Sequence, residues 1–167
     1  LDFATLGAEK LDPRALFAVM PDLEIFDGTD DGQRATRICD AEVVLTNKVR
    51  LDRRLMDEAR VLRLIGLTAT GNDNIDLAYA KERGIAVCNI RAYCSQSVVE
   101  HVFGVLLNLT HSIGNFDRSV KSGQWQKAQN FCMLNYPIRE LSAMTIGIVG
   151  YGELGKGVAN IARQFNM

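Results

Sequence analysis

The sequence has no excess of charge of either sign and no long apolar run. Its 19 Lys and Arg residues are balanced by 20 Asp and Glu residues among 167, which leaves a formal charge of -1. Such a balance offers no basic surface for nucleic acid and no acidic tail. No apolar run reaches the roughly 20 residues of a membrane helix, because charges or glycines interrupt each one. We therefore expect neither nucleic acid nor a membrane as a partner.

Signals for export and for disulfide formation are also missing. The first ten residues, LDFATLGAEK, have no basic start and no long apolar stretch, so no secretion signal is visible. The four cysteines show no CxxC spacing and no dense framework. Cysteines used in this way suit a reducing compartment. These absences predict a cytoplasmic protein.

Apolar residues make up 47% of the chain, which is enough to bury a sizeable core. Up to residue 90, short apolar runs alternate with amphipathic segments. The runs predict strands over LDFATL (1–6), LEIF (23–26), EVVLT (42–46), LRLIGL (62–67) and IAVCNI (85–90). Helices are expected from Asp12 and Pro13 to about Met20, over 31–39, over DRRLMDEAR (52–60) and from Ile75 to Arg83, where Gly84 ends the last one. This alternation predicts an α/β fold in which helices cover both faces of a parallel sheet.

A longer helix is expected next. Ser97 and Glu100 stand in capping-box register, and apolar residues then recur at helical spacing as far as about Gly123. Residues 124–144 show little periodicity, which predicts an irregular connector. The run TIGIV (145–149) then predicts a strand that starts a second domain.

Directly after TIGIV, the sequence has the G-x-G-x-x-G spacing of a dinucleotide-binding loop, and the helix VANIARQF follows. Gly150 would make the tight turn, Gly152 would let the backbone approach a pyrophosphate, and Gly155 would let helix and strand pack closely. The phosphates would lie on amide groups at the helix N-terminus. The candidate cofactor-binding residues are therefore Gly150, Gly152, Glu153, Leu154 and Gly155. An ordinary turn that happens to use glycines is the alternative.

A dinucleotide domain consists of two βαβαβ halves, and this chain holds one expected strand and one helix of the first. The acidic residue that would hold the ribose, about 20 residues after the glycines, would lie beyond Met167. We therefore expect the chain to be incomplete. The choice between NAD and NADP depends on the missing part, so both stay open.

Several separated motifs resemble those of the D-2-hydroxyacid dehydrogenases, above all the glycerate dehydrogenases, also called hydroxypyruvate reductases. The similar stretches are VVLTNKVRLD (43–52), LIGLTATGNDNIDL (64–77), GIAVCNIRAYCSQSVVEHVFGVLL (84–107), the pair Gly123 and Trp125, PIREL (137–141) and TIGIVGYGELG (145–155). The resemblance implies a flavodoxin-like substrate domain over 1–95, a long interdomain helix over 96–123, and a connector with the start of a Rossmann domain over 124–167. It also implies hydride transfer between NAD or NADP and C2 of a small 2-oxo or D-2-hydroxy acid, namely hydroxypyruvate, glyoxylate or D-glycerate.

In this family, an Arg holds the substrate, and a His that is paired with a Glu donates the proton. The planar, always charged guanidinium group suits the first role, and an imidazole that titrates near neutral pH suits the second. All three are expected after Met167, so no catalytic residue is expected in this chain and no turnover from residues 1–167 alone. Relatives dimerise through the dinucleotide domain and its linking helix. A homodimer is therefore expected for the full-length protein.

The resemblance places substrate-binding residues in two loops. In the loop TATGND, Gly71 and Asn72 would offer main-chain N–H groups to the substrate's carboxylate. Lys48, after the third expected strand, would attract the same anion. The alternatives are a glycine needed only for the turn and a lysine that is only solvated surface.

The resemblance also places Cys94 and Val98 on the nicotinamide side of the cofactor. The family often has Ser or another small polar residue where Cys94 stands, so packing against the cofactor is expected there, and a small buried residue at a helix start is the alternative. His101 and His111 are the only histidines, and they lie ten residues apart on the expected helix. They are too far apart to share a metal ion, so no metal site is expected.

A second class of function fits the same fold. In a dinucleotide-sensing, corepressor-like binding protein, the cofactor would drive dimerisation and partner recruitment instead of metabolism. An exposed apolar peptide groove would favour that function, whereas the downstream Arg, Glu and His would favour the enzyme. The stretches around TNKV and GNDNID favour an enzyme that acts on small acids.

Overall fold

The computed structural model describes residues 1–7 and 11–167, which form two compact units, Leu1–Arg91 and Ala92–Met167. Each unit has its own hydrophobic core, and each is described by itself. None of the helices in the described residues combines the length and the apolar character needed to cross a membrane.

The first unit is built on a parallel sheet in the order β1-β2-β3. Its strands are short and mostly apolar: β1 (Val43–Thr46), β2 (Leu64–Leu67) and β3 (Ala86–Asn89). Val43 pairs with Leu64, and Leu67 pairs with Asn89, so the three strands end at the same edge. The predicted α/β fold with a parallel sheet is confirmed.

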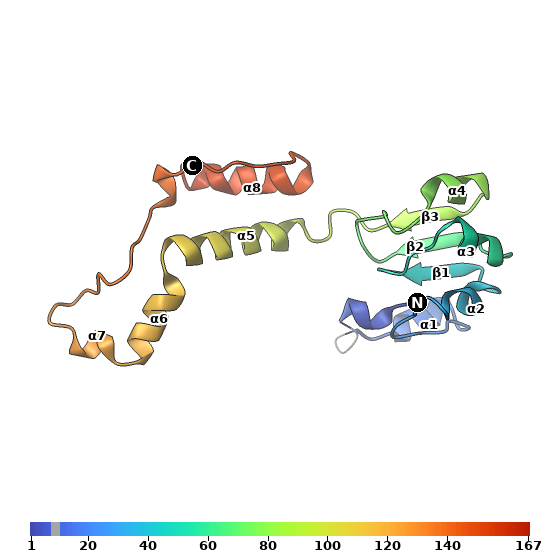
Figure 1. The fold of residues 1–167 in the computed structure, drawn as a ribbon, viewed down its shortest axis with the longest axis horizontal. Coiled ribbons are helices and arrows are strands. Elements are labelled where there is room, and N and C mark those ends of the chain that lie inside the picture. The colour runs from blue at the N-terminus through green and yellow to red at the C-terminus, as the bar shows by residue number, and fades with distance from the viewer. Residues whose placement is uncertain (8–10) are drawn as a thin grey trace. The chain divides into compact units, whose positions relative to one another are not determined.

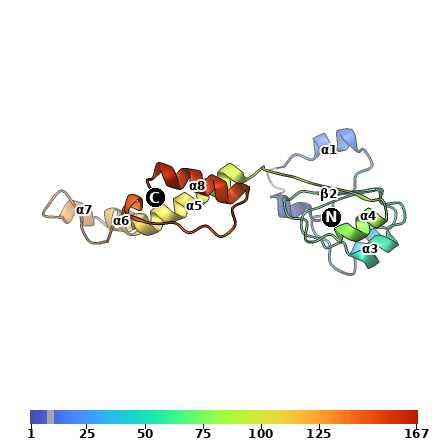
Figure 2. The same ribbon diagram turned by 90° about the horizontal axis from the view of Figure 1, so that it is seen from above.

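Short helices connect the strands, and each begins where a capping residue stands in the sequence. The carboxylate of Asp52 accepts a hydrogen bond of 3.0 Å from the N–H of Leu55 and opens α3 (Arg53–Glu58). Asp76 caps α4 (Leu77–Glu82) through the N–H of Tyr79 in the same way. Figure 2 shows α3 and α4 on one face of the sheet and α1 (Arg14–Val19) on the other. A short α2 (Arg34–Ile38) precedes β1.

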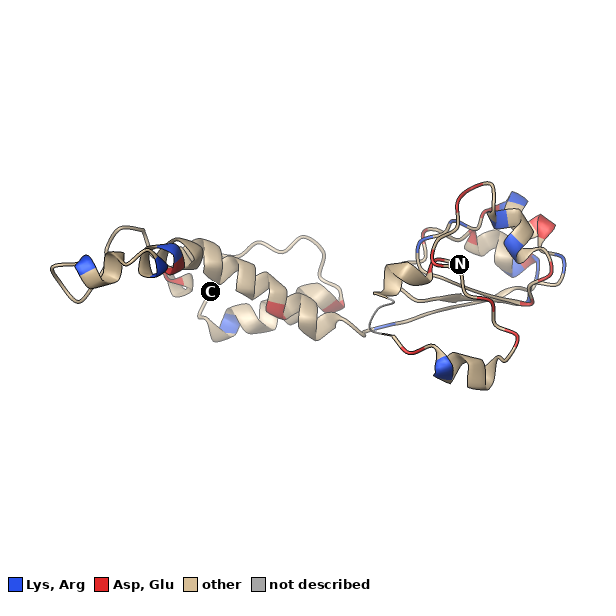
Figure 3. Cartoon of the chain, turned by 90° about the horizontal axis from the view of Figure 1, so that it is seen from below, with Lys and Arg blue, Asp and Glu red and all other residues tan. Residues whose placement is uncertain are grey.

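The core of this unit lies between the sheet and these helices. Ile65, at the centre of β2, is fully buried, as are Leu51, Met56 and Ile38. Lys and Arg residues and Asp and Glu residues are both spread over the helices and loops of this unit, as Figure 3 shows.

Two of the predicted strands do not form. Residues 1–6 contain the 3₁₀-helix η1 (Phe3–Leu6), and residues 23–26 are irregular. The N–H of Phe3 donates to the carbonyl of Phe26 over 2.9 Å, so the two segments still lie together. The turn forms because the hydroxyl of Thr5 donates to the carbonyl of Asp2, whose buried carboxylate is held by the chain after β1.

The second unit contains α5 (Ser95–Thr110), α6 (Ile113–Lys121), α7 (Gln124–Lys127), η3 (Leu141–Ala143) and α8 (Glu153–Gln164). Figures 1 and 2 show α5 and α8 side by side. A Cβ at Gly157 of α8 would lie 2.8 Å from Cγ2 of Val99, so the two helices approach closely there. The rings of Phe103 and Phe165 stack with centroids 5.4 Å apart.

The prediction of one continuous helix to Gly123 was wrong, because the chain breaks at Ser112, whose φ is +51°. The carbonyl of Thr110 accepts from the N–H of Arg139, and the N–H of Gly114 donates to the side chain of Asn108. In a continuous helix, the N–H of Gly114 would donate to the carbonyl of Thr110, but both groups have other partners here. The capping-box prediction was also wrong, since α5 begins at Ser95 and the Ser97 hydroxyl donates to the carbonyl of Cys94.

The run TIGIV (145–149) does not form the predicted strand. Ile146 and Ile148 pack against the core between α5 and α8, whereas Val149 is fully exposed. A strand needs a neighbour for its backbone hydrogen bonds, and the described residues supply none here. The helix expected after the glycine loop is present as α8.

Core burial at Ile65 should carry much of the stability of the first unit. Ile65→Ala leaves a cavity at the centre of the sheet and should lower the free energy of unfolding by about 3 kcal/mol, measured by urea denaturation. Val43→Ala, on the 38% exposed Val43 of the edge strand β1, is the matched control. Val43→Ala should lower the free energy of unfolding by less than about 1 kcal/mol. Equal losses of unfolding free energy in the two variants would contradict the described core.

Candidate functional site

The loop that follows β1 is organised by the buried carboxylate of Asp2. This carboxylate accepts hydrogen bonds from the hydroxyl of Thr46 at 3.1 Å and from the N–H of Asn47 at 2.9 Å. The N–H of Lys48 also donates to it. The main-chain donors of this loop are therefore occupied within the protein, and what Lys48 presents to solvent is its exposed ammonium-bearing side chain.

The loop that follows β2 has free main-chain donors. The N–H groups of Gly71 and Asn72 donate to no acceptor in the part of the chain that the structure describes, and both residues are exposed. Gly71 does not have a positive φ, so the turn itself does not require glycine. A Cβ at Gly71 would lie 3.2 Å from Oδ1 of Asp73, so glycine leaves room beside that carboxylate.

Side-chain amides join these loops at the edge where the strands end. Nδ2 of Asn74 donates to the carbonyl of Val49 over 3.0 Å and so ties the second loop to the first. Nδ2 of Asn89, the last residue of β3, donates to the carbonyl of Thr70 over 2.7 Å. The structure thus places Lys48 on the first of two adjoining loops and places Gly71 and Asn72 on the second.

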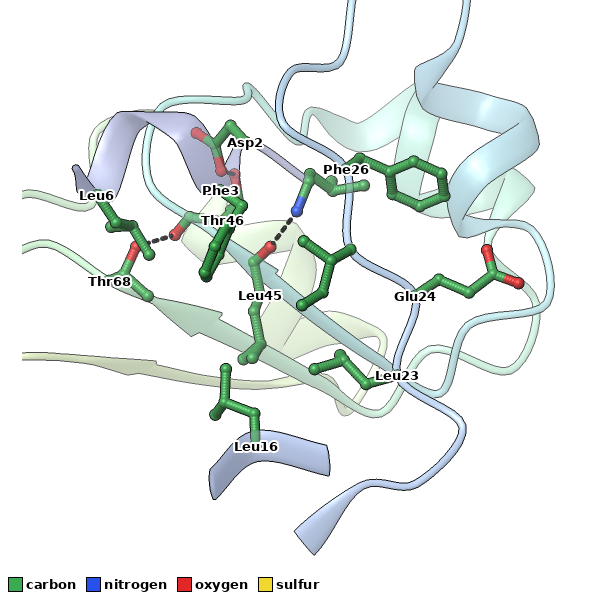
Figure 4. Close-up of a pocket in the computed structure, with 12 residues that line it drawn as sticks. Asp2, Phe3, Leu6, Leu16, Leu23, Glu24, Phe26, Leu45, Thr46 and Thr68 are labelled. Atoms are coloured by element: carbon green, nitrogen blue, oxygen red, sulfur yellow. Dashed lines mark hydrogen bonds between the residues drawn. The ribbon is translucent and has the colours of Figure 1, made fainter. Parts of the chain in front are cut away.

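Two hollows lie elsewhere in the first unit. An apolar cavity of about 120 Å³ lies between η1, residues 23–26 and β1, as Figure 4 shows. The main-chain nitrogen of Leu1 donates to the Leu45 carbonyl over 2.7 Å beside it. A polar hollow of about 240 Å³ is lined by Arg50, Asp52, Asp73, Asn74, Ile75 and Asp76. Neither hollow contains Lys48, Gly71 or Asn72.

In the second unit, the glycine loop has the backbone geometry that its spacing predicts. Gly150 has a φ of +93°, a backbone conformation that residues other than glycine rarely adopt. A Cβ at Gly155 would lie 2.2 Å from the carbonyl oxygen of Gly150, so only glycine fits where α8 begins. Around Gly152 the space is open. The turn and the close packing are therefore present, and an approach to the backbone at Gly152 is unobstructed.

The N-terminus of α8 is available to an anion. Its N-cap residue, Gly152, provides no side-chain cap. The first N–H groups of a helix, here those of Glu153 and Leu154, have no partner within the helix and carry partial positive charge. A helix N-terminus beside a glycine turn is the arrangement that binds phosphate groups in proteins.

Cys94 and Val98 lie at the start of α5, and both are half-buried. Cys94 is the N-cap residue of this helix but caps it with no side-chain hydrogen bond. The hydroxyl of the next residue, Ser95, donates a hydrogen bond to a carboxylate oxygen of Glu153. The start of α5 therefore adjoins the glycine loop within the second unit.

Sequence reasoning missed two residues that organise these loops. Asp2 bonds Asn47, 45 positions away, and Ser95 bonds Glu153, 58 positions away. No local sequence motif predicts either contact. The two histidines lie on or next to α5, His101 exposed and His111 half-buried. The described residues contain no group of three or more metal-ligating side chains.

Comparison with known proteins places the chain in a family. Residues 7–164 match the family model described as "D-isomer specific 2-hydroxyacid dehydrogenase, catalytic domain". The chain belongs to this family of dehydrogenases. The resemblance seen in the separated motifs is thereby confirmed.

Named relatives lie within the same family. The glycerate dehydrogenase of Methylorubrum extorquens is 40% identical over 131 residues, which are 78% of this chain and 42% of the relative. The hydroxypyruvate reductase of Blautia hydrogenotrophica is 35% identical over 139 residues, 83% of this chain and 43% of the relative. The chain thus spans less than half the length of these curated 2-hydroxyacid dehydrogenases.

A solved structure of the family shares the fold. The D-lactate dehydrogenase of Aquifex aeolicus, crystallised with NAD and lactic acid, superimposes with a TM-score of 0.71 at 27% identity. The superposition covers 92% of this chain and 46% of that enzyme. The predicted fold class, a flavodoxin-like unit followed by the beginning of a Rossmann domain, is therefore that of the 2-hydroxyacid dehydrogenases.

Gly155→Ala tests the close contact at the start of α8. The added methyl group would collide with the Gly150 carbonyl, so we expect a loss of about 2 kcal/mol in unfolding free energy. The control is Gly104→Ala, on the exposed side of α5, where a Cβ meets nothing within 4 Å. That variant should gain about 0.5 kcal/mol, because alanine favours helix. Equal melting temperatures of the two variants would contradict the described loop.

Proposed function

We propose that the protein catalyses hydride transfer between NAD or NADP and C2 of a small 2-oxo or D-2-hydroxy acid. The observation that carries this proposal is the glycine loop, with its positive φ at Gly150, its close contact at Gly155 and its free helix N-terminus, in a chain of the 2-hydroxyacid dehydrogenase family. The pyrophosphate of the dinucleotide would accept hydrogen bonds from the N–H groups at Glu153 and Leu154.

The substrate carboxylate would bind at the edge of the sheet in the first unit. Gly71 and Asn72 have free, exposed N–H groups, and Lys48 supplies a positive charge from the adjoining loop. Two N–H donors and one ammonium suit a carboxylate. Because relatives are named glycerate dehydrogenase and hydroxypyruvate reductase, we propose hydroxypyruvate, glyoxylate or D-glycerate as substrates.

The nicotinamide would contact the start of α5. Cys94 and Val98 are half-buried there and would pack against the ring, which needs apolar contact and no acid–base group. A D-lactate dehydrogenase of the family is solved with NAD, which supports a nicotinamide cofactor for this protein as well. Both NAD and NADP remain within the proposal.

We propose that residues 1–167 bind but do not complete the reaction. Reduction of a 2-oxo acid delivers the hydride to C2 and a proton to the resulting oxyanion, which requires an acid near that oxygen. His101 and His111 lie within and at the end of α5, not on the loops proposed to bind substrate. The carboxylate-binding Arg and the His–Glu pair would come from sequence beyond Met167.

A homodimer in the cytoplasm is also proposed. Apolar side chains around α6 and α7 and in the chain after them are exposed, Phe131 at 93% and Leu134 at 88%. Exposed large apolar side chains gathered in one part of the chain are a feature of interfaces between subunits. The relevant measurement is the molar mass of the full-length protein by light scattering, for which twice the monomer mass is expected.

The activity is tested with the full-length protein and hydroxypyruvate, glyoxylate and pyruvate as substrates. We expect oxidation of NADH or NADPH, followed at 340 nm, with the first two acids preferred over pyruvate. A polypeptide limited to residues 1–167 should show no turnover. Absence of turnover by the full-length protein with all three acids would contradict the proposed activity.

Lys48→Ala tests the substrate edge. Loss of one charge near the substrate carboxylate should raise KM for hydroxypyruvate roughly five-fold and leave kcat within about two-fold, because the contact is made equally in ground and transition states. The control is Lys81→Ala on α4, an exposed lysine with the same change of charge. If both variants keep the wild-type KM, Lys48 is solvated surface only.

A further inference from the structure

A polar contact joins the beginnings of the two packed helices of the second unit. Ser95 is the first residue of α5, and Glu153 is the first residue of α8 and lies inside the glycine loop. The Ser95 hydroxyl donates to Oε1 of Glu153 although 58 positions separate the two residues. The contacts of Val99 with Gly157 and of Phe103 with Phe165 hold the helices together beneath this pair.

Glu153 has no other side-chain or N–H partner in the part of the chain that the structure describes. Its carboxylate does not cap α8, although it stands in the first turn, where a helix attracts negative charge. The bond to Ser95 instead directs it to the N-terminus of α5, which attracts negative charge equally. The carboxylate is thus held away from the free N–H groups of its own helix.

The direction of this carboxylate matters because of its charge. A dinucleotide pyrophosphate carries two negative charges and would use the same N–H groups at the start of α8. A carboxylate free to turn over those N–H groups would compete with the pyrophosphate for them and repel it. We propose that Ser95 is a positioning residue that holds Glu153 aside and keeps the N-terminus of α8 open to the cofactor, an inference that rests on the function proposed above.

The test is a double-mutant cycle on the full-length protein, with binding of NADH and NADPH measured by titration calorimetry. Ser95→Ala releases the carboxylate and should raise the dissociation constant roughly five-fold at low ionic strength. Glu153→Gln removes the charge and should bind at least as tightly as the wild type. Ser95→Ala combined with Glu153→Gln should return to the affinity of Glu153→Gln alone, because no charge remains to be held.

Further variants separate this role from a structural one. Ser95→Thr keeps the hydroxyl and should bind as the wild type does. Ser97→Ala, two residues along the same helix, removes a hydroxyl that bonds only the Cys94 carbonyl, and Glu140→Gln makes the same change of charge outside the loop. Both should leave affinity unchanged. In about 0.5 M salt the defect of Ser95→Ala should shrink to less than two-fold, because salt screens charge repulsion but not a packing defect.

The outcomes separate this inference from the proposed function. If the wild type binds a nucleotide and the double variant stays as weak as Ser95→Ala, the hydroxyl acts through structure and the inference is wrong. Weaker binding by Glu153→Gln alone would also overturn it, because the carboxylate would then assist the cofactor. Absence of nucleotide binding by the wild type would instead overturn the proposed function, and this inference with it.

Discussion

The parallel, in-register pairing of β1, β2 and β3 determines where the proposed substrate loops lie. Because parallel strands all end at one edge, the loops after Thr46 and after Leu67 emerge side by side. Asn74 can then reach the carbonyl of Val49, and Asn89 can reach that of Thr70. Lys48 and Gly71 are remote from each other in sequence, and this pairing is what places them on adjoining loops.

A single buried carboxylate completes that edge. Asp2 is only 6% exposed, and burial of a charged group is costly unless donors surround it. The hydroxyl of Thr46 and the N–H groups of Asn47 and Lys48 satisfy it. The same contact fixes the beginning of the chain against the end of β1, which favours a 3₁₀ turn over the strand expected from the apolar pattern of residues 1–6.

The second unit depends on close backbone approaches and not on sheet pairing. Gly157 lets α8 lie against Val99, and Gly155 lets the start of α8 lie against the carbonyl of Gly150. A side chain at either position would push the helix outward. The hydrogen bond from Ser95 to Glu153 becomes possible only once α5 and α8 have packed. The geometry of the glycine loop is thus linked to the helix that precedes the connector.

The sequence by itself determined the features that depend on neighbouring residues. Asp52 and Asp76 mark helix starts, the short apolar runs at 43–46 and 64–67 mark strands, and the glycine spacing at 150–155 marks a turn that opens a helix. Only the tertiary structure decided the rest. Among the described residues, the run 145–149 has no strand to pair with. In the same unit, α5 ends because the N–H of Arg139 takes the carbonyl of Thr110, and Ser95 meets Glu153 across the helix pair. Hydrogen bonds between residues far apart in the chain depend on which segments pack together, and a local pattern of residues does not contain that information.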